Sequence, residues 1–203
     1  MGGTLRGRDG DEAMKATLFD YGAGNLHSLG RALGRLGLTV EVSTDATVKT
    51  DLLVLPGVGA FGLAADRLAP ARDAVRASLA RGQPLIGICL GMQLLFDASE
   101  EDGLTPGRGL SVLDGTVTRL QTRRVPHIGW SRLEGDGRAM YFAHSFACRP
   151  VDARVVTAWA RHDDERFPAA VRLGRIAGVQ FHPEKSSHDG LSLLEALVRE
   201  VTS

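Results

Sequence analysis

The first half of the chain alternates short apolar runs with segments of helical periodicity. Leucines recur every three or four positions over residues 25–36, which predicts an amphipathic helix that Gly37 ends. A second helix is predicted over 63–81, with a break at Pro70. The apolar runs that predict strands cover residues 16–20, 38–43, 51–55 and 85–88. Alternating strands and helices predict a parallel sheet with helices on both faces.

The pattern changes after about Gly103, where short β-like runs are separated by Gly, Asp and Pro. We expect a β-rich section over 110–160, including a hairpin about Asp114-Gly115 that joins Val112-Leu113 to the next run. A strand over 176–181 then returns the chain to the sheet, and a helix over 189–201 closes it.

These elements predict the α/β class: a single-domain open, mostly parallel sheet with flanking helices and a β-rich section in the second half. The length of the chain supports one domain, because 203 residues can bury a sizeable core without disulfides or a structural metal ion. We assign the domain to residues 14–203 and expect residues 1–13 to be a disordered leader.

Composition removes several classes of function. Lys plus Arg and Asp plus Glu are both 24, and this balance argues against a nucleic-acid binder. The longest apolar stretch, 84–96, is too short for a membrane helix, and no apolar segment follows the charged N-terminus as in a signal peptide. We therefore expect no membrane association and a cytoplasmic protein. Neither the cysteines nor the histidines have metal-ligand spacing, so we expect no metal and no cofactor.

Gly87-Ile-Cys89-Leu-Gly91 has the form of a nucleophile elbow, in which a strand ends, one residue is held in a strained turn and a helix begins. This geometry exposes the Cys89 sulfur near a helix N-terminus, which favours the thiolate, and directs the Leu90 N–H at an oxyanion. The alternative is that Cys89 is a buried, unreactive residue.

His182-Pro183-Glu184 supplies a base with an attached carboxylate. Pro183 favours an extended backbone at His182, and residues two apart in an extended segment point to the same side. We therefore expect the Glu184 carboxylate to reach the imidazole and fix its tautomer.

Gly57-Val58-Gly59 follows a predicted strand and belongs to a Gly-x-Gly-x-x-Gly pattern ending at Gly62. The pattern formally matches a dinucleotide fingerprint, but no acidic residue ends a second strand about 20 positions later. We interpret it as a flexible loop beside the elbow that supplies a further oxyanion N–H.

Three motifs in this order resemble those of class I glutamine amidotransferases: Pro56-Gly-Val-Gly-Ala-Phe61, Gly87-Ile-Cys-Leu-Gly-Met-Gln93 and His182-Pro-Glu184. Further segments resemble the glutaminase subunits of imidazole glycerol phosphate synthases, which serve histidine biosynthesis. These segments are Asp20-Tyr-Gly-Ala-Gly-Asn-Leu26, Val125-Pro-His-Ile-Gly-Trp130, Tyr141-Phe-Ala-His-Ser-Phe146 and His182-Pro-Glu-Lys-Ser-Ser187.

The resemblance implies that Cys89 attacks the side-chain amide of glutamine and that His182, held by Glu184, passes a proton to the departing ammonia. The N–H groups of Leu90, Gly57 and Val58 then form the oxyanion hole. The resemblance also implies contacts to the amino-acid end of glutamine from Gly57, Gly59, Gln93, Ser145 and Phe146.

The resemblance further implies a partner, a (β/α)₈-barrel cyclase that receives the ammonia, with Asn25, Trp130 and Lys185 at the interface. Two positions depart from the family pattern. Ser131 stands where Asn is usual, and Phe146-Ala147 replaces a commoner Tyr-Tyr.

Three other functions stay open from the sequence. One is the glutaminase subunit of another synthase, serving pyridoxal phosphate, anthranilate or aminodeoxychorismate synthesis. Another is a stand-alone cysteine peptidase or deglycase of similar fold. The third is a non-catalytic scaffold that holds a synthase partner.

Overall fold

The computed structural model describes residues 13–22, 24–45, 48–106 and 108–203. Residues 1–12 of the expected leader lie outside the described residues, so that expectation stays a prediction.

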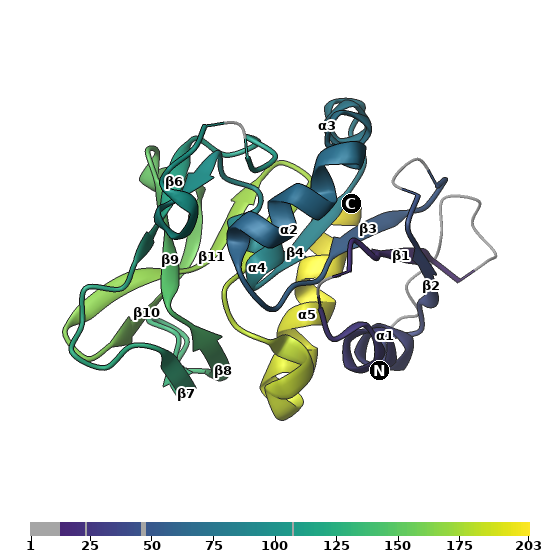
Figure 1. The fold of residues 1–203 in the computed structure, drawn as a ribbon. Coiled ribbons are helices and arrows are strands. Elements are labelled where there is room, and N and C mark those ends of the chain that lie inside the picture. Colours follow the sequence, from purple (N-terminus) through teal and green to yellow (C-terminus); the bar gives the residue numbers. More distant parts are fainter. Residues whose placement is uncertain (1–12, 23, 46–47, 107) are drawn as a thin grey trace.

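The described residues form a seven-stranded sheet that joins the two halves of the chain (Figure 1). The strands from β12 to β2 are parallel, and two antiparallel strands extend one edge. In spatial order the strands are β10 (Val156–His162), β11 (Glu165–Leu173), β12 (Ile176–Val179), β4 (Leu85–Ile88), β3 (Leu52–Leu55), β1 (Lys15–Phe19) and β2 (Thr39–Ser43). The predicted open, mostly parallel sheet is confirmed.

Helices cover both faces of this sheet (Figure 1). One face carries α1 (Leu26–Arg35) and α5 (Ser187–Thr202), and the other carries α2 (Phe61–Leu68), the 3-10 turn η1 (Ala69–Ala71) and α3 (Arg72–Ala80). In β3, Leu52 and Val54 join the core beneath α1 and α5, whereas Leu53 and Leu55 join the core beneath α2 and α3. Alternate side chains of a strand point to opposite faces, so a strand that is apolar throughout needs cover on both.

The predicted break at Pro70 is confirmed, because η1 separates α2 from α3 there. Proline lacks the N–H that an α-helix would use at that position. The first of these helices begins at Phe61, two residues before the predicted start.

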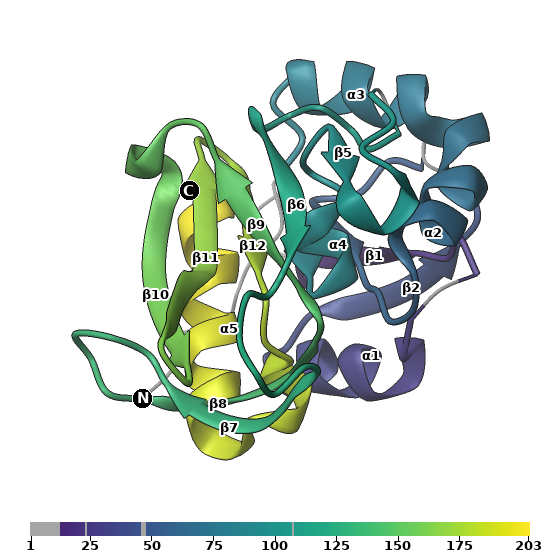
Figure 2. The same ribbon diagram turned by 60° about the vertical axis from the view of Figure 1, so that its left-hand side comes forward.

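The β-rich section builds further pairings beside the main sheet (Figure 2). The described strands are β5 (Ala98–Ser99), β6 (Gly115–Arg119) and β9 (Phe146–Pro150) in one small sheet and β7 (His127–Arg132) and β8 (Ala139–His144) in a hairpin. The remaining short helices are α4 (Leu90–Gln93), η2 (Glu100–Asp102), η3 (Ala153–Val155) and η4 (Pro183–Lys185). β10, at the end of this section, and β11, which follows it, extend the edge of the main sheet, which the sequence pattern did not predict.

The predicted hairpin about Gly115 is wrong. β6 begins at Gly115 and pairs with β5 and β9. The N–H groups of Val112 and Leu113 instead donate to the Leu95 carbonyl, at 2.9 and 3.0 Å. Because α4 ends after one turn, the carbonyls beyond it have no helical donor and capture these N–H groups.

Arg175 ties the last turn of α5 to the sheet. Its guanidinium donates to the carbonyls of Val201 and Thr202, both at 2.9 Å, and to that of Gly82 at 3.2 Å. The last carbonyls of a helix have no helical donor, so Arg175 satisfies groups that the helix itself leaves unpaired.

Arg175→Gln should lower the free energy of unfolding by about 2 kcal/mol, since hydrogen bonds to a charged group contribute about 1.5–3 kcal/mol. Urea denaturation measures this loss. The matched control is Arg172→Gln, which removes only an exposed ion pair to Glu200 (2.7 Å) and should cost at most about 1 kcal/mol. Equal losses in the two variants would contradict the role given to Arg175.

Candidate active site

Cys89 occupies a strained turn between a strand and a helix. β4 ends at Ile88, Cys89 has φ 53° and ψ −105°, and α4 begins at Leu90. A non-glycine residue in such a conformation costs about 1–3 kcal/mol, which the surrounding structure must hold. The predicted turn geometry is therefore present, but Cys89 is only 5% exposed, so the predicted exposure of its sulfur is wrong. The role of Cys89 as nucleophile stays a prediction.

Glycine is required on both sides of this turn. A Cβ on Gly87 would lie 2.5 Å from the Gly91 carbonyl oxygen, and a Cβ on Gly91 would lie 2.0 Å from the Leu55 carbonyl oxygen. Both obstacles are backbone atoms, which do not move aside. The spacing Gly-x-Cys-x-Gly thus allows β3, β4 and α4 to approach closely.

His182 and Glu184 form a buried pair. His182 Nδ1 lies 2.9 Å from Glu184 Oε1, and both side chains are 3% exposed. The predicted contact is confirmed, but the predicted extended route to it is wrong. His182 itself is extended, whereas Glu184 lies in the turn η4, which carries its carboxylate back to the imidazole.

The surroundings of His182 favour its protonated form. Burial lowers the pKa of His182, but hydrogen bonds with Cys89 and Glu184, together with their negative charge, outweigh burial and raise the pKa to about 9. His182 can therefore hold a proton at neutral pH beside the sulfur.

The glycine loop packs against the elbow. Gly57 is buried, and a Cβ there would lie 2.6 Å from the Leu90 Cβ and 2.9 Å from the Gly91 nitrogen. Gly59 has φ +112° with open space around it, and Val58 is 44% exposed. The loop thus has one tightly packed residue followed by residues with room to move.

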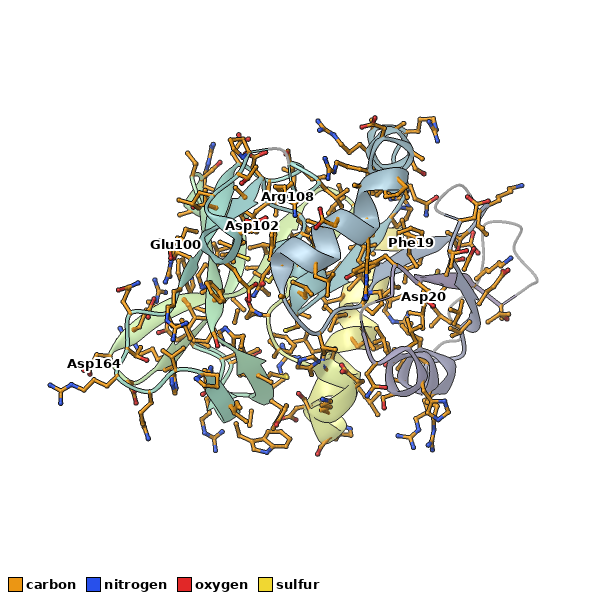
Figure 3. The ribbon with its side chains drawn as sticks, viewed as in Figure 1. Phe19, Asp20, Glu100, Asp102, Arg108 and Asp164 are labelled. Carbon is orange, nitrogen blue, oxygen red and sulfur yellow. The ribbon has the colours of Figure 1, made fainter. Side chains whose placement is uncertain are left out.

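Both ends of this loop are anchored. The Tyr21 hydroxyl donates to the Pro56 carbonyl, and the Phe61 N–H donates to Glu101 Oε2 at 2.6 Å. Asp102 and Arg108 lie side by side near α2 (Figure 3), with Arg108 Nε 3.0 Å from Asp102 Oδ2. Arg108 also donates to the Gly62 carbonyl at 2.9 Å, so Glu101 and Arg108 together hold the start of α2.

These contacts argue against the dinucleotide alternative. In that fold the N-terminus of the following helix binds a phosphate. Here the first N–H of α2, at Phe61, already has a carboxylate acceptor from this chain, Glu101.

A cavity of about 280 Å³ lies where Cys89 and His182 meet. The predicted residues that line it are Val58, Gly59, Cys89, Leu90, Gln93, Ser145, Phe146, His182 and Lys185. Gly57 and Glu184 do not line it, because Gly57 packs beneath Leu90 and Glu184 holds His182 from the other side. The structure thus brings together residues from the glycine loop, the elbow, the β-rich section and η4.

Sequence reasoning missed several residues around this cavity. Glu101 contributes a carboxylate to the lining, yet it stands in an acidic run, 100–102, that no motif marks. Gln180 was also missed, although its Nε2 lies 3.5 Å from Cys89 Sγ. Its position two residues before His182 at a strand end is a usable signal, since such side chains point to the same side. The other missed lining residues are Pro126, Ile128, Ala143 and His144.

The three predicted interface residues lie in two places. Trp130 is 54% exposed, and its ring centroid lies 6.0 Å from that of Tyr141. The exposed Lys185 Nζ lies 5.8 Å from the same Tyr141 ring, within the range of a cation–π contact. Asn25 is separate and caps α1, where its Oδ1 accepts from the Ser28 N–H at 3.3 Å.

Two further observations concern the described residues only. Among residues 13–22, 24–45, 48–106 and 108–203, no three His, Cys, Asp or Glu side chains gather as they would around a metal ion. No helix in those same segments has the length and apolar character to cross a membrane.

The sequence of this chain is similar to those of glutamine amidotransferases. A family model described as glutamine amidotransferase class-I matches residues 17–200. The imidazole glycerol phosphate synthase subunit HisH of Natronomonas pharaonis is 42% identical, over 93% of this chain and 95% of that protein. The protein of the same name from Pyrococcus furiosus is 40% identical, over 89% of this chain and 96% of that protein.

Solved structures share the fold. One described as a glutamine amidotransferase superposes with a TM-score of 0.73 at 23% identity, over 90% of this chain and 97% of that chain. The structure of PurLQS from Thermotoga maritima superposes with a TM-score of 0.64 at 20% identity, over 92% of this chain and 98% of that chain. At these identities the likeness shows the fold alone.

Glu184→Gln should lower the pH at which His182 loses its proton. The imidazolium persists up to about pH 9 because Cys89 and Glu184 raise the pKa of His182 against the effect of burial, and the variant removes the charge of one of these two partners. An NMR titration of the His182 ring measures the midpoint. His27→Gln, at an exposed position outside the site, is the control and should leave the midpoint near pH 9. An unchanged midpoint in Glu184→Gln would contradict the assignment.

Gly87→Ala should force the elbow apart and lower the free energy of unfolding by about 1–3 kcal/mol, as overpacking does. The alkylation rate of Cys89 should change with it, because the turn that presents the sulfur is distorted. Gly34→Ala is the control, since a Cβ there meets nothing within 4 Å in helix α1 and should be neutral or stabilising by up to about 1 kcal/mol. Urea denaturation and mass spectrometry of alkylated Cys89 give the two readings, and a stable, normally reactive Gly87→Ala protein would refute the packing argument.

Proposed function

Because the chain belongs to the class-I glutamine amidotransferases and, within them, to the HisH subunits of imidazole glycerol phosphate synthase, we propose that it hydrolyses glutamine through Cys89. The ammonia released is delivered to a cyclase subunit. The chain is thus a glutaminase subunit of an enzyme of histidine biosynthesis. We propose that residues 14–203 form this domain, which the family match over 17–200 supports.

One observation carries the assignment of the active residues. Cys89, in its strained turn, lines the same cavity as His182, and against the effect of burial Cys89 and the hydrogen-bonded Glu184 together raise the pKa of that imidazole. A sulfur nucleophile, a proton carrier and an orienting carboxylate are the groups that acyl transfer from an amide requires.

In the first half of the proposed reaction, Cys89 Sγ forms a bond to the side-chain carbonyl carbon of glutamine. The negative charge that develops on the carbonyl oxygen is held by N–H groups of Leu90, Gly57 and Val58. A lost oxyanion donor typically costs on the order of 10²–10³ in rate, so the setting of this loop controls the rate. The carbon–nitrogen bond then breaks, and the nitrogen takes a proton from His182 and leaves as ammonia.

In the second half, water hydrolyses the thioester. His182, now neutral, accepts a proton from water while the water oxygen bonds to the thioester carbon. The carbon–sulfur bond breaks and returns its electron pair to Cys89 Sγ, which releases glutamate. Glu184 steadies the positive charge on His182 at both ends of the cycle.

The amino-acid end of glutamine is proposed to lie between Gly59, Gln93 and the Ser145-Phe146 segment. The carboxylate of Glu101 in the cavity lining suits the substrate α-ammonium group. The carbonyl of Phe146 already accepts from Gln93 Nε2 at 3.1 Å, so we expect other atoms of this segment to contact glutamine.

The proposed partner is a (β/α)₈-barrel cyclase subunit. Ammonia released into water takes a proton and loses its nucleophilicity, so direct transfer between docked subunits preserves it. The cluster of exposed Trp130, half-buried Tyr141 and exposed Lys185 supports a docking surface close to the cavity, since Lys185 belongs to both. Trp and Tyr side chains are enriched among the residues that anchor protein–protein interfaces. We propose that Asn25, the N-cap of α1, makes a further contact with the cyclase.

We further propose a cytoplasmic location. The mechanism needs a free thiol, and Cys89 and Cys148 are both unpaired. A reducing compartment keeps such thiols from forming disulfides.

Cys89→Ala should abolish glutamine-dependent synthesis by the complex of this chain with the cyclase, because the attacking sulfur is gone. Ammonia-dependent synthesis by the same complex should persist, since the partner's chemistry does not need Cys89. Both rates are measured with the cyclase nucleotide substrate present, and glutamate release is recorded with and without the cyclase. Cys148→Ala, at the other buried cysteine, is the matched control and should retain glutamine-dependent synthesis.

Three results would refute the proposal. Full glutaminase activity in Cys89→Ala would show that Cys89 is not the nucleophile. Loss of both glutamine-dependent and ammonia-dependent synthesis would show that Cys89 has a structural role. Hydrolysis of peptides without any release of glutamate from glutamine would favour the stand-alone cysteine hydrolase.

A further inference from the structure

Two buried histidines outside the proposed triad form a hydrogen-bonded pair. His127 and His144 face each other across β7 and β8, and each is at most 6% exposed. His127 Nδ1 lies 3.0 Å from His144 Nε2. His144 Nδ1 lies 2.8 Å from the Phe146 carbonyl oxygen, and His127 Nε2 lies 2.9 Å from Ser131 Oγ.

The Phe146 carbonyl fixes which ring nitrogen carries the proton in both histidines. A carbonyl oxygen only accepts, so His144 must carry its proton on Nδ1. A neutral His144 then accepts at Nε2, which requires a proton on His127 Nδ1. His127 in turn accepts at Nε2 from the Ser131 hydroxyl. Only this order of donors and acceptors, running from the Ser131 hydroxyl through both imidazoles to the Phe146 carbonyl, satisfies all four groups.

The electrostatics agree with neutral rings. Burial lowers the pKa of His127 to about 4, with a further lowering from His162 that Asp163 partly offsets. Burial also lowers the pKa of His144 to about 3, against the opposing effect of its hydrogen bond to the Phe146 carbonyl. Both rings are therefore uncharged near neutral pH.

A second arm of the network starts from the same carbonyl and ends at the sulfur. Gln93 Nε2 donates to the Phe146 carbonyl at 3.1 Å and to Gln180 Oε1 at 3.2 Å. Because the Gln180 oxygen is used as an acceptor, its amide nitrogen is the atom that faces Cys89 Sγ, at 3.5 Å. Gln180 is fully buried, so water does not compete for these bonds.

We propose that Gln180 and His144 are positioning residues, which hold the Gln93 amide and the Cys89 sulfur in one hydrogen-bond arrangement set by the Phe146 carbonyl. The inference rests on the proposed function, since it gives the network a part in presenting Cys89 to glutamine.

Two consequences follow for the site. The Gln180 N–H directed at Sγ stabilises negative charge on the sulfur, as donors to anions do. Gln93, whose nitrogen serves the two internal acceptors, keeps its oxygen for a donor in the cavity, such as the amino group of glutamine. His144 supports both by adding a second donor to the Phe146 carbonyl, which fixes the direction in which Gln93 points.

The first test reads the tautomers directly in the unmodified chain. ¹⁵N NMR of histidine-labelled protein near pH 7 should show neutral rings protonated on Nδ1 for both His127 and His144. Signals are assigned by loss in His144→Asn and His127→Asn, and the exposed His27 serves as an internal reference. A proton on Nε2 of His144, or a charged ring at either position, would overturn the proposal.

The second test compares variants by the alkylation rate of Cys89, read by mass spectrometry with iodoacetamide as the probe. Gln180→Met has similar volume but no donor, and it should slow alkylation about tenfold, as expected for loss of a hydrogen bond to an anion. Gln121→Met, at an exposed glutamine away from the site, is the control and should react as the unmodified chain does. Equal reactivity of Gln180→Met and the unmodified chain would overturn the proposal.

The third test separates positioning from packing at His144. Asparagine places an amide nitrogen near the position of Nδ1 and preserves the donor to Phe146, whereas leucine removes it. His144→Leu should lower Cys89 alkylation and kcat for glutamine severalfold with a smaller change in KM, and His144→Asn should restore both to within about twofold. Equal loss in the two variants would assign His144 to packing alone. Alkylation of Cys89 needs no glutamine, so it tests the positioning role separately from the proposed function. If the variants show the expected differences in alkylation rate but the unmodified chain has no glutaminase activity, the proposed function is refuted and the positioning role stands.

Discussion

The close approach of backbones around Cys89 is the constraint on which the rest of the structure depends. Three glycines, Gly57, Gly87 and Gly91, lie where any Cβ would meet backbone or a Leu90 side chain. Only this approach lets the chain pass from β4 into α4 in a single residue and keeps that residue in a strained conformation with positive φ. Packing supplies the energy that holds the strained turn, and the turn in turn presents the sulfur to the cavity.

The β-rich section holds the segment that carries His182 and Glu184 in place through hydrogen bonds to its backbone and to Ser186. The backbone N–H of His182 donates to the Tyr141 carbonyl at 2.9 Å, and Ser186 Oγ accepts from the backbone N–H of Tyr141 at 2.9 Å. These bonds fasten β8 to η4, which carries Glu184. A charge buried without such a framework is strongly destabilising. The section that sequence periodicity described only as short β runs is therefore the part of the chain to which the segment carrying His182 and Glu184 is bonded.

Local chemistry explains which parts of the fold and site are predictable. The leucines of α1, the break at Pro70 and the glycines about Cys89 act over a few residues, so their consequences are visible in the pattern itself. The prediction of a hairpin about Gly115 is wrong because a contact from outside the segment decides its structure. The Leu95 carbonyl, from an earlier turn, accepts from the N–H groups of the first expected strand. Glu101 and Gln180 escape notice because each gains its meaning from a contact with a distant segment, Phe61 or Cys89.

By itself the sequence determined the sheet class, the elbow and the contact of Glu184 with His182, because spacing, turn chemistry and strand periodicity are local properties of a chain. Tertiary structure alone decided that Glu184 reaches the imidazole through a 3-10 turn, that β10 and β11 extend the main sheet, and that the Phe146 carbonyl accepts from both Gln93 and His144. Hydrogen-bond direction is a property of the assembled network, since each buried donor must find an acceptor from another segment.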